Sequence, residues 1–226
     1  MERHEDLDLE TLRDRLRRVP IFPLPSTVLI PGGHLPLHVF EPRYRAMVRD
    51  CLAGDRLMAV GLLAGEEEDP RPPIHPVSGL GLISAHAELP DGRFFILLEG
   101  LIRARIVKEL RTSEPYRQVR VVPIPDDDPH DGAALALSGQ ILQRLVLDLA
   151  RHLPEDTGQP LVKACLRERN PGRLADVIGA AVLVDHEQRQ RFLEESDPER
   201  RLDLMTMAVS AVLTRIGDVR GERSPN

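Results

Sequence analysis

The sequence predicts an α+β fold in which a small β-barrel with one embedded helix precedes a bundle of α-helices. Before residue 125, six or more short apolar stretches alternate with proline and glycine turns, which is typical of a closed or nearly closed barrel. Beyond residue 132, apolar residues recur at three- and four-residue steps, the spacing of amphipathic helices. The acidic, proline-containing stretch 126–132 between them is expected to be a linker.

Residues 1–18 are expected to form an amphipathic helix that extends the barrel at its N-terminus. Leu9, Leu12 and Leu16 share one helical stripe among charged residues. The barrel is predicted over residues 19–125. It begins with short strand candidates at 19–24 and 27–30, which are interrupted by prolines of the kind tolerated at sheet edges and bends.

The stretch LPLHVFEPRYRAMV, residues 35–48, predicts a strand followed directly by a helix. Its first half alternates apolar residues as in a half-buried strand. Pro42 suits the first helical turn, and Gly54 marks a stop. We expect its apolar residues to be core rather than contacts with a partner: Leu35, Leu37, Val39, Phe40, Tyr44 and Met47. An open apolar groove beside this stretch would favour peptide binding, and a filled one would favour a scaffold.

The remaining strands are predicted from alternation and turn chemistry. Residues 57–63 form a short apolar run, and residues 79–89 and 93–99 flank the Pro90-Asp91-Gly92 turn, a strong hairpin pattern. Phe94 and Phe95 are expected on opposite faces of their strand. A further strand over 102–106 alternates Ile102, Ala104 and Ile106 with Arg103 and Arg105, and the last runs over 117–124.

Helices of the predicted bundle, residues 133–218, are marked by caps and prolines. One helix spans 135–149, and Pro160 is expected to start another. Asn170-Pro171 opens a helix that reaches Val184, and Asp185 with Gln188 has the spacing of a capping box. Asp197-Pro198 opens the last helix, which Gly217 is expected to close. Residues 219–226 are expected to be a flexible tail.

Composition describes an ordinary soluble globule. The 226 residues are 42% hydrophobic and 29% charged, and the net charge of −6 argues against a phosphate-backbone partner. Cys51 and Cys165 are expected to be buried thiols. The N-terminus lacks the apolar core of a secretory signal, and the longest apolar run, residues 177–184, is shorter than the roughly 20 residues that span a bilayer. We therefore expect a soluble, cytoplasmic protein that binds no membrane.

No catalytic, cofactor-binding or metal-binding residue is assigned. The sequence has no GxxxxGK[ST] loop and no GxSxG elbow, and neither Lys108 nor Lys163 lies near a motif that singles out a serine. His186-Glu-Gln-Arg-Gln190 begins like HExxH but has glutamine where the second histidine belongs. Neither an enzyme activity nor a cofactor is expected.

A basic stripe is formed by Arg103 and Arg105, with Arg111, Arg117 and Arg120 as possible extensions. Single-stranded nucleic acid binding usually needs stacking aromatic residues beside such a stripe, and aromatic residues make up only 3% of this chain. We therefore favour a salt-bridged sheet surface over an RNA platform, and nucleic acid is not the expected partner.

Several segments resemble the Lon N-terminal domain family, also called the Lon substrate-binding domain family, which has a PUA-like barrel. Residues 35–48 are the most specific match. The resemblance also covers residues 20–24, 28–32, 81–84, 89–93, 97–100 and 103–105, and in the helical half residues 174–178, 190–193 and 200–202. Overall it spans about residues 19 to 215 and implies a stand-alone domain without the ATPase and peptidase domains of full-length Lon proteases.

What this resemblance implies is a bacterial, proteolysis-related, non-catalytic module that binds proteins. The expected partners are proteins or peptides with exposed apolar segments, engaged as an adaptor for unfolded or misfolded chains. RNA binding by a PUA-like module is the alternative, and a cryptic hydrolase is a third. We call residues 35–48 the family stretch. Within it, Glu41, Pro42, Arg43 and Tyr44 are singled out as a structural motif, and Glu41 is expected to form an ion pair with Arg103 or Arg105.

Overall fold

The computed structural model describes residues 15–65 and 71–221, and the chain divides into two compact units between Ile124 and Pro125. Most of the expected N-terminal helix, residues 1–18, lies outside the described residues. Leu16, which is described, is buried, and its carbonyl accepts a hydrogen bond from the Val121 amide at 3.0 Å. The segment before the first strand is thus anchored to the first unit at this point.

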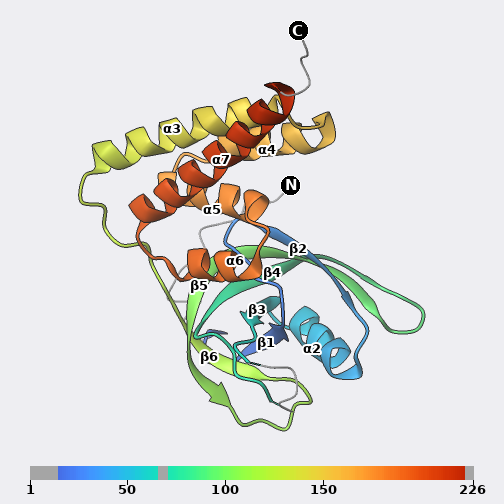
Figure 1. Ribbon diagram of the computed structural model, residues 1–226. Coiled ribbons are helices and arrows are strands. Elements are labelled where there is room, and N and C mark those ends of the chain that lie inside the picture. The colour runs from blue at the N-terminus through green and yellow to red at the C-terminus, as the bar shows by residue number, and fades with distance from the viewer. Residues whose placement is uncertain (1–14, 66–70, 222–226) are drawn as a thin grey trace. The chain divides into compact units, whose positions relative to one another are not determined.

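The described part of the first unit contains a mixed β-sheet and the helix α2, which together with the helices of the second unit confirm the α+β class (Figure 1). β1 and β3 pair in parallel, and all other pairings are antiparallel. Its elements are β1 (Val19–Leu24), β2 (His34–Val39), α2 (Pro42–Ala53), β3 (Leu57–Leu62), β4 (Val77–Glu88), β5 (Phe94–Leu110) and β6 (Gln118–Pro123).

Strand β5 connects the sheet into a ring. The strand order is β2-β5-β4-β3-β1-β6, and β6 also pairs with β5, so the pairings return to the strand from which they started. β5 combines the two segments predicted over 93–99 and 102–106 into one strand of 17 residues. Its first part pairs with β2 and β4, and its last part pairs with β6, with irregularities between Leu80 and Gly81, Ile83 and Ala85, and Ile106 and Lys108.

Two apolar clusters lie on opposite sides of the central strands. In β3, Leu57 and Ala59 belong to one cluster, while Met58 and Val60 belong to the cluster that also receives α2. Successive side chains of a strand point to opposite faces, so a strand between two clusters is buried at every position. This explains why β3 reads as a continuous apolar run and why α2 buries Tyr44, Met47, Val48 and Cys51.

Residues 27–30 were predicted as a strand but do not form one, although Val28, Leu29 and Ile30 are buried. Their backbone instead passes close to glycines of β4 and β5. A Cβ atom at Gly79 would lie 1.9 Å from the Leu29 carbonyl oxygen, and one at Gly100 would lie 2.3 Å from that of Ile30. The segment packs against the sheet at positions without side chains, which is a tertiary arrangement that short-range alternation does not reveal.

The described part of the second unit consists of five helices: α3 (Gly132–Ala150), α4 (Glu155–Arg167), α5 (Pro171–Val182), α6 (His186–Glu194) and α7 (Pro198–Gly221). The predicted caps are confirmed, since Asn170 accepts from the Arg173 amide and Asp185 from the Gln188 amide. Two predicted helix boundaries, one start and one end, were wrong. Pro160 lies inside α4, which begins at Glu155, and α7 continues past Gly217 to Gly221.

Arg201 joins three segments of the second unit. This side chain of α7 is fully buried, and its Nη2 donates to Asp126 Oδ2 at 2.7 Å while its Nε lies 3.1 Å from Asp176 Oδ1 on α5. Its Nη1 donates to the carbonyls of Glu195 and Ser196. Asp126, in the stretch expected to be a linker, is therefore held against the helices of this unit.

We expect Gly79→Ala to destabilise the first unit by about 2–3 kcal/mol, because the new methyl group meets backbone atoms of Leu29 that no side-chain rotation can move away. Urea unfolding monitored by circular dichroism measures this loss. Gly132→Ala is the matched control, since nothing lies within 4 Å of a Cβ at that position. An unfolding midpoint for Gly79→Ala equal to that of the control would contradict the close approach.

Arg201→Ala is expected to cost about 3–5 kcal/mol of unfolding free energy, because it leaves the Asp176 carboxylate buried without this cation. The neighbouring Arg200→Ala is the control. The Arg200 side chain is 73% exposed and its ion pairs are longer than 3.3 Å, so its removal should change stability by less than about 0.5 kcal/mol. Thermal unfolding of the two variants side by side tests the difference.

Candidate functional site

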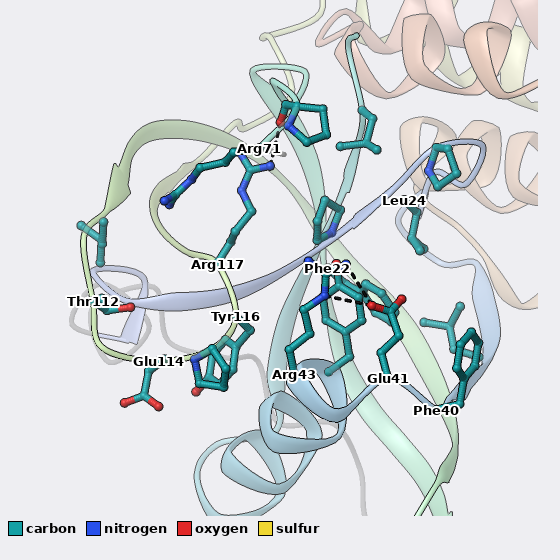
Figure 2. Close-up of a pocket in the computed structure, with 18 of the residues that line it drawn as sticks. Phe22, Leu24, Phe40, Glu41, Arg43, Arg71, Thr112, Glu114, Tyr116 and Arg117 are labelled. Carbon is teal, nitrogen blue, oxygen red and sulfur yellow. Dashed lines mark hydrogen bonds and ion pairs between the residues drawn. The ribbon is translucent and has the colours of Figure 1, made fainter. Parts of the chain in front are cut away.

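A pocket of about 950 Å³ opens in the first unit beside the family stretch (Figure 2). Four parts of the chain form its walls: the end of β1, the junction of β2 with α2, the residues around Arg71 and the β5–β6 connection. The close turn from β2 into α2 brings the end of residues 35–48 to the rim, because Pro42 begins the helix directly after the strand.

Aromatic rings form one wall of the pocket. The Phe22 and Tyr44 rings lie 4.3 Å apart between centroids, and the Arg43 guanidinium lies 4.5 Å from the centroid of the Tyr44 ring. Burial is the main reason that the pKa of Tyr44 is raised above its ordinary value, so its hydroxyl stays protonated near neutral pH. Arg43 in turn donates from Nε to Glu41 Oε2 at 2.9 Å.

The expected ion pair of Glu41 with Arg103 or Arg105 is wrong: among the described residues, Glu41 pairs with Arg43. The strand register supplies the reason. Val39 lies opposite Phe94, so Glu41 sits at the beginning of β5, whereas Arg103 lies nine residues further along that strand. At about 3.3 Å per residue this separation is roughly 30 Å of strand. Arg103 is buried opposite Gly79, and Arg105 is exposed.

Arg71 and Arg117 line the opposite wall, and Glu109, which lies behind them outside the pocket lining, pairs with both in an arginine–glutamate cluster. Arg117 makes a two-point contact with Glu109, from Nε to Oε1 at 2.8 Å and from Nη2 to Oε2 at 2.7 Å, while its Nη1 donates to the Pro72 carbonyl at 2.7 Å. Arg71 also donates to Glu109 from Nε at 2.9 Å. Burial alone would raise the pKa of Glu109, but the hydrogen bonds from Arg117 and Arg71 outweigh it and lower that pKa.

Tyr116 ties the β5–β6 connection to α2. Its hydroxyl donates to Asp50 Oδ2 at 2.7 Å, and the Gln118 amide nitrogen lies 3.5 Å from the same hydroxyl oxygen. Burial and the neighbouring Asp50 carboxylate raise the pKa of Tyr116 strongly. The Tyr116–Asp50 hydrogen bond thus holds the β5–β6 connection, which forms part of the pocket wall, against α2.

The rim of the pocket carries an exposed aromatic side chain. Phe40, expected to be core, is 60% exposed, which corrects that prediction. His38, also on the rim, stacks on Phe95 with ring centroids 4.6 Å apart. Val39, Tyr44 and Met47 are buried as expected. Phe94 is buried and Phe95 exposed, as the predicted opposite orientation requires.

This geometry suits non-covalent binding of an extended polypeptide. The aromatic wall and the exposed Phe40 offer apolar surface to the side chains of such a ligand. The arginines of the opposite wall offer hydrogen-bonding groups to its peptide groups. Glu41 and Glu109 are both held by arginines. In the part of the chain that the structure describes, no three His, Cys, Asp or Glu side chains gather as metal ligands would. Both cysteines are free and buried, as predicted.

Sequence reasoning found one wall of the pocket and missed the other. Glu41, Arg43 and Tyr44 were singled out and line it, and Pro42 begins α2. The cluster of Glu109, Arg117 and Arg71 was not found. An antiparallel pairing of the strands around 109 and 117 would have brought the first two together, but nothing local points to Arg71, which lies in a loop 38 residues before Glu109.

Comparison with known proteins identifies relatives that match most of the chain. The family model for the ATP-dependent protease La (LON) substrate-binding domain matches residues 18–211. The Lon protease of Dictyoglomus thermophilum is 29% identical over 203 residues, which are 89% of this chain and 25% of that protein. Lon protease 2 of Myxococcus xanthus is 31% identical over 192 residues, 83% of this chain and 23% of that protein. The chain therefore spans about a quarter of these relatives.

Two solved structures have the same fold. The N-terminal domain of the Mycobacterium avium complex Lon protease aligns with a TM-score of 0.66 at 21% identity, covering 85% of this chain and 98% of that one. A Lon N-terminal domain protein from Xanthomonas campestris aligns with a TM-score of 0.57 at 25% identity, covering 83% of this chain and 96% of that one.

We expect Glu109→Gln to lower stability by about 1 kcal/mol at pH 7, because it removes the charge shared by Arg117 and Arg71 at a partly exposed site. The folded-state pKa of Glu109 is lowered, so its contribution is present above its unfolded pKa and is lost as pH falls through the folded value. The melting temperatures of the variant and the wild type should therefore converge below about pH 4. A difference that is constant from pH 7 to pH 3 would contradict this.

Proposed function

Because this chain belongs to the Lon substrate-binding domain family, we propose that it is a non-catalytic substrate-recognition module that acts as an adaptor for unfolded or misfolded proteins. The supporting observation is the open pocket beside residues 35–48, with aromatic rings on one wall and Phe40 exposed on its rim. An open groove at this position favours a binding module over a scaffold in which the same residues are filled core.

The proposed ligand is an exposed apolar segment in extended conformation. Folded proteins bury most of their large apolar side chains, so such segments are a mark of unfolded chains. A pocket that combines apolar surface with satisfied charges binds such a segment without selecting one sequence, since dispersion and hydrophobic contacts are not directional. The relatives carry the printed name Lon protease, and we propose that this chain shares their recognition of protein substrates rather than their proteolysis.

The architecture and location expected from the sequence complete the proposal. We propose that the strand ring is the PUA-like barrel, that residues 133–218 are a helical bundle and that 126–132 link the two. We also propose a cytoplasmic location. One described helix, α3, passes a test of length and apolar character for crossing a bilayer, which is weak evidence because core helices of soluble proteins pass it too.

Replacing Phe40 by serine is expected to weaken binding to a fluorescein-labelled, reduced and carboxymethylated α-lactalbumin by about 5- to 30-fold, the usual effect of removing a central aromatic contact. Fluorescence anisotropy with the full chain measures it. Val184→Ser is the control, since Val184 is 93% exposed, belongs to the second unit and is not one of the residues that line the pocket.

Wild-type binding that does not exceed that of an unrelated acidic protein would remove the support for this function. Equal losses in the Phe40 and Val184 variants would show that the probe is bound by general apolar exposure and not by the pocket.

A further inference from the structure

The outer face of the β5–β6 hairpin gathers cations on neighbouring strands. Arg105 lies opposite Val122, and Lys108 lies opposite Arg120. Residues paired directly across an antiparallel ladder point to the same face. Arg105, Lys108 and Arg120 are all exposed, and so are Val107 at 53% and Val122 at 40%. We call Arg105, Val107, Lys108, Arg120 and Val122 the cationic face.

A β-bulge creates this face. The register shifts between Ile106 and Lys108, which leaves Val107 without a partner on β6. In a regular strand Lys108 would point to the opposite face from Arg105, because side chains alternate. The extra residue turns Lys108 outward, next to Arg120. Bulges of this kind re-aim side chains and are common beside functional sites.

The arrangement is unfavourable for the isolated chain. Like charges directly opposite each other on a sheet are destabilising. Within the described residues, neither Arg105, Lys108 nor Arg120 takes part in an ion pair, while Glu109, on the other face of β5, is held by Arg71 and Arg117. Residues 103–120 contain six cations and two acids in a chain of net charge −6.

A second pocket continues the cationic face at the end of the hairpin. Its volume is about 880 Å³, and Arg18, Lys108 and Arg111 line it together with Glu109 and the β5–β6 connection. The Glu109 carboxylate is already shared by Arg71 and Arg117, so it does not neutralise the three cations. Arg18 is oriented by a hydrogen bond from its Nε to Gln118 Oε1 at 2.7 Å. The positive surface thus extends from the middle of the hairpin to its end, long enough for an extended segment rather than a single ion.

We propose that the cationic face is a docking surface for an acidic polypeptide segment that also carries aliphatic side chains. Charge complementarity supports an acidic partner. The exposed side chains between the cations are valines, which pack against aliphatic residues, whereas single-stranded nucleic acid needs aromatic rings on which bases stack. None of the five residues of the cationic face lines the pocket that carries the proposed function, so each proposal can fail without the other.

Binding of a fluorescein-labelled 12-residue peptide of alternating glutamate and valine to the full chain tests the proposal. At 50 mM NaCl, Lys108→Glu/Arg120→Glu should weaken binding at least 10-fold, and 200 mM NaCl should weaken wild-type binding. Arg144→Glu/Arg215→Glu is the control with the same change of charge, on exposed positions of α3 and α7, and should stay within twofold of wild type.

Lys108→Glu alone gives a second readout. It should raise the melting temperature by about 1–3 °C, because it replaces a repulsive cross-strand pair by an attractive one, while it weakens peptide binding. A purely structural lysine would not combine higher stability with lost binding. Phe40→Ser should leave binding of this peptide unchanged, which separates this surface from the pocket.

Three results would overturn the proposal. The first is no peptide binding by wild type, or equal binding by the two charge-reversed double variants. The second is tighter binding of a 20-nucleotide oligouridylate than of the peptide, since this would make nucleic acid the occupant. The third is an unchanged affinity of Lys108→Glu for the peptide.

Discussion

Strand β5 is the element on which the first unit depends. Its 17 residues pair with three other strands, and no shorter strand could reach both β2 at one end and β6 at the other. The ring of pairings holds β1 and β3 between two apolar clusters, which buries both faces of these strands. Both proposed binding surfaces also depend on β5, because its last residues contribute Leu110 to the lining of the pocket and Lys108 to the cationic face.

The two faces of the β5–β6 hairpin differ in whether their charged side chains form ion pairs. Beside the pocket, Glu109 is shared by Arg71 and Arg117, so the charges of these two arginines are partly compensated. On the outer face, Lys108 and Arg120 stand opposite each other without an acid. A wall of ion-paired arginines beside aromatic rings favours apolar segments, whereas cations without an acidic partner attract acidic ones. Adjacent residues of one strand thereby serve two different kinds of contact.

In the second unit, the buried cation Arg201 connects several segments of the chain. Removing Arg201 from water is costly, and two carboxylates and two carbonyls offset this cost. The contacts join α7 to α5 and to the chain that enters the unit at Asp126. These contacts help to fix where the entering segment lies, since a planar guanidinium accepts few alternative positions for its partners.

Local chemistry in the sequence was sufficient for much of this molecule. The hairpin about Asp91-Gly92, the proline start of α2 and the caps at Asn170 and Asp185 depend on neighbours within a few residues. They were therefore predictable, as was the α+β class. Pro160 and Gly217 show the limit of such rules, because both residues lie inside helices that continue past them.

Tertiary structure alone decided the parts that involve distant residues. Register placed Glu41 far from Arg103 and beside Arg43, and glycines at 79 and 100 let residues 27–30 pass over the sheet without joining it. Phe40 became exposed because the chain turns into α2 at that point, although its apolar character predicted core. The sequence by itself determined the family stretch and one wall of the pocket. The other wall and the cationic face required the pairing of β5 with β6 and its bulge, because strand register is a property of the assembled sheet.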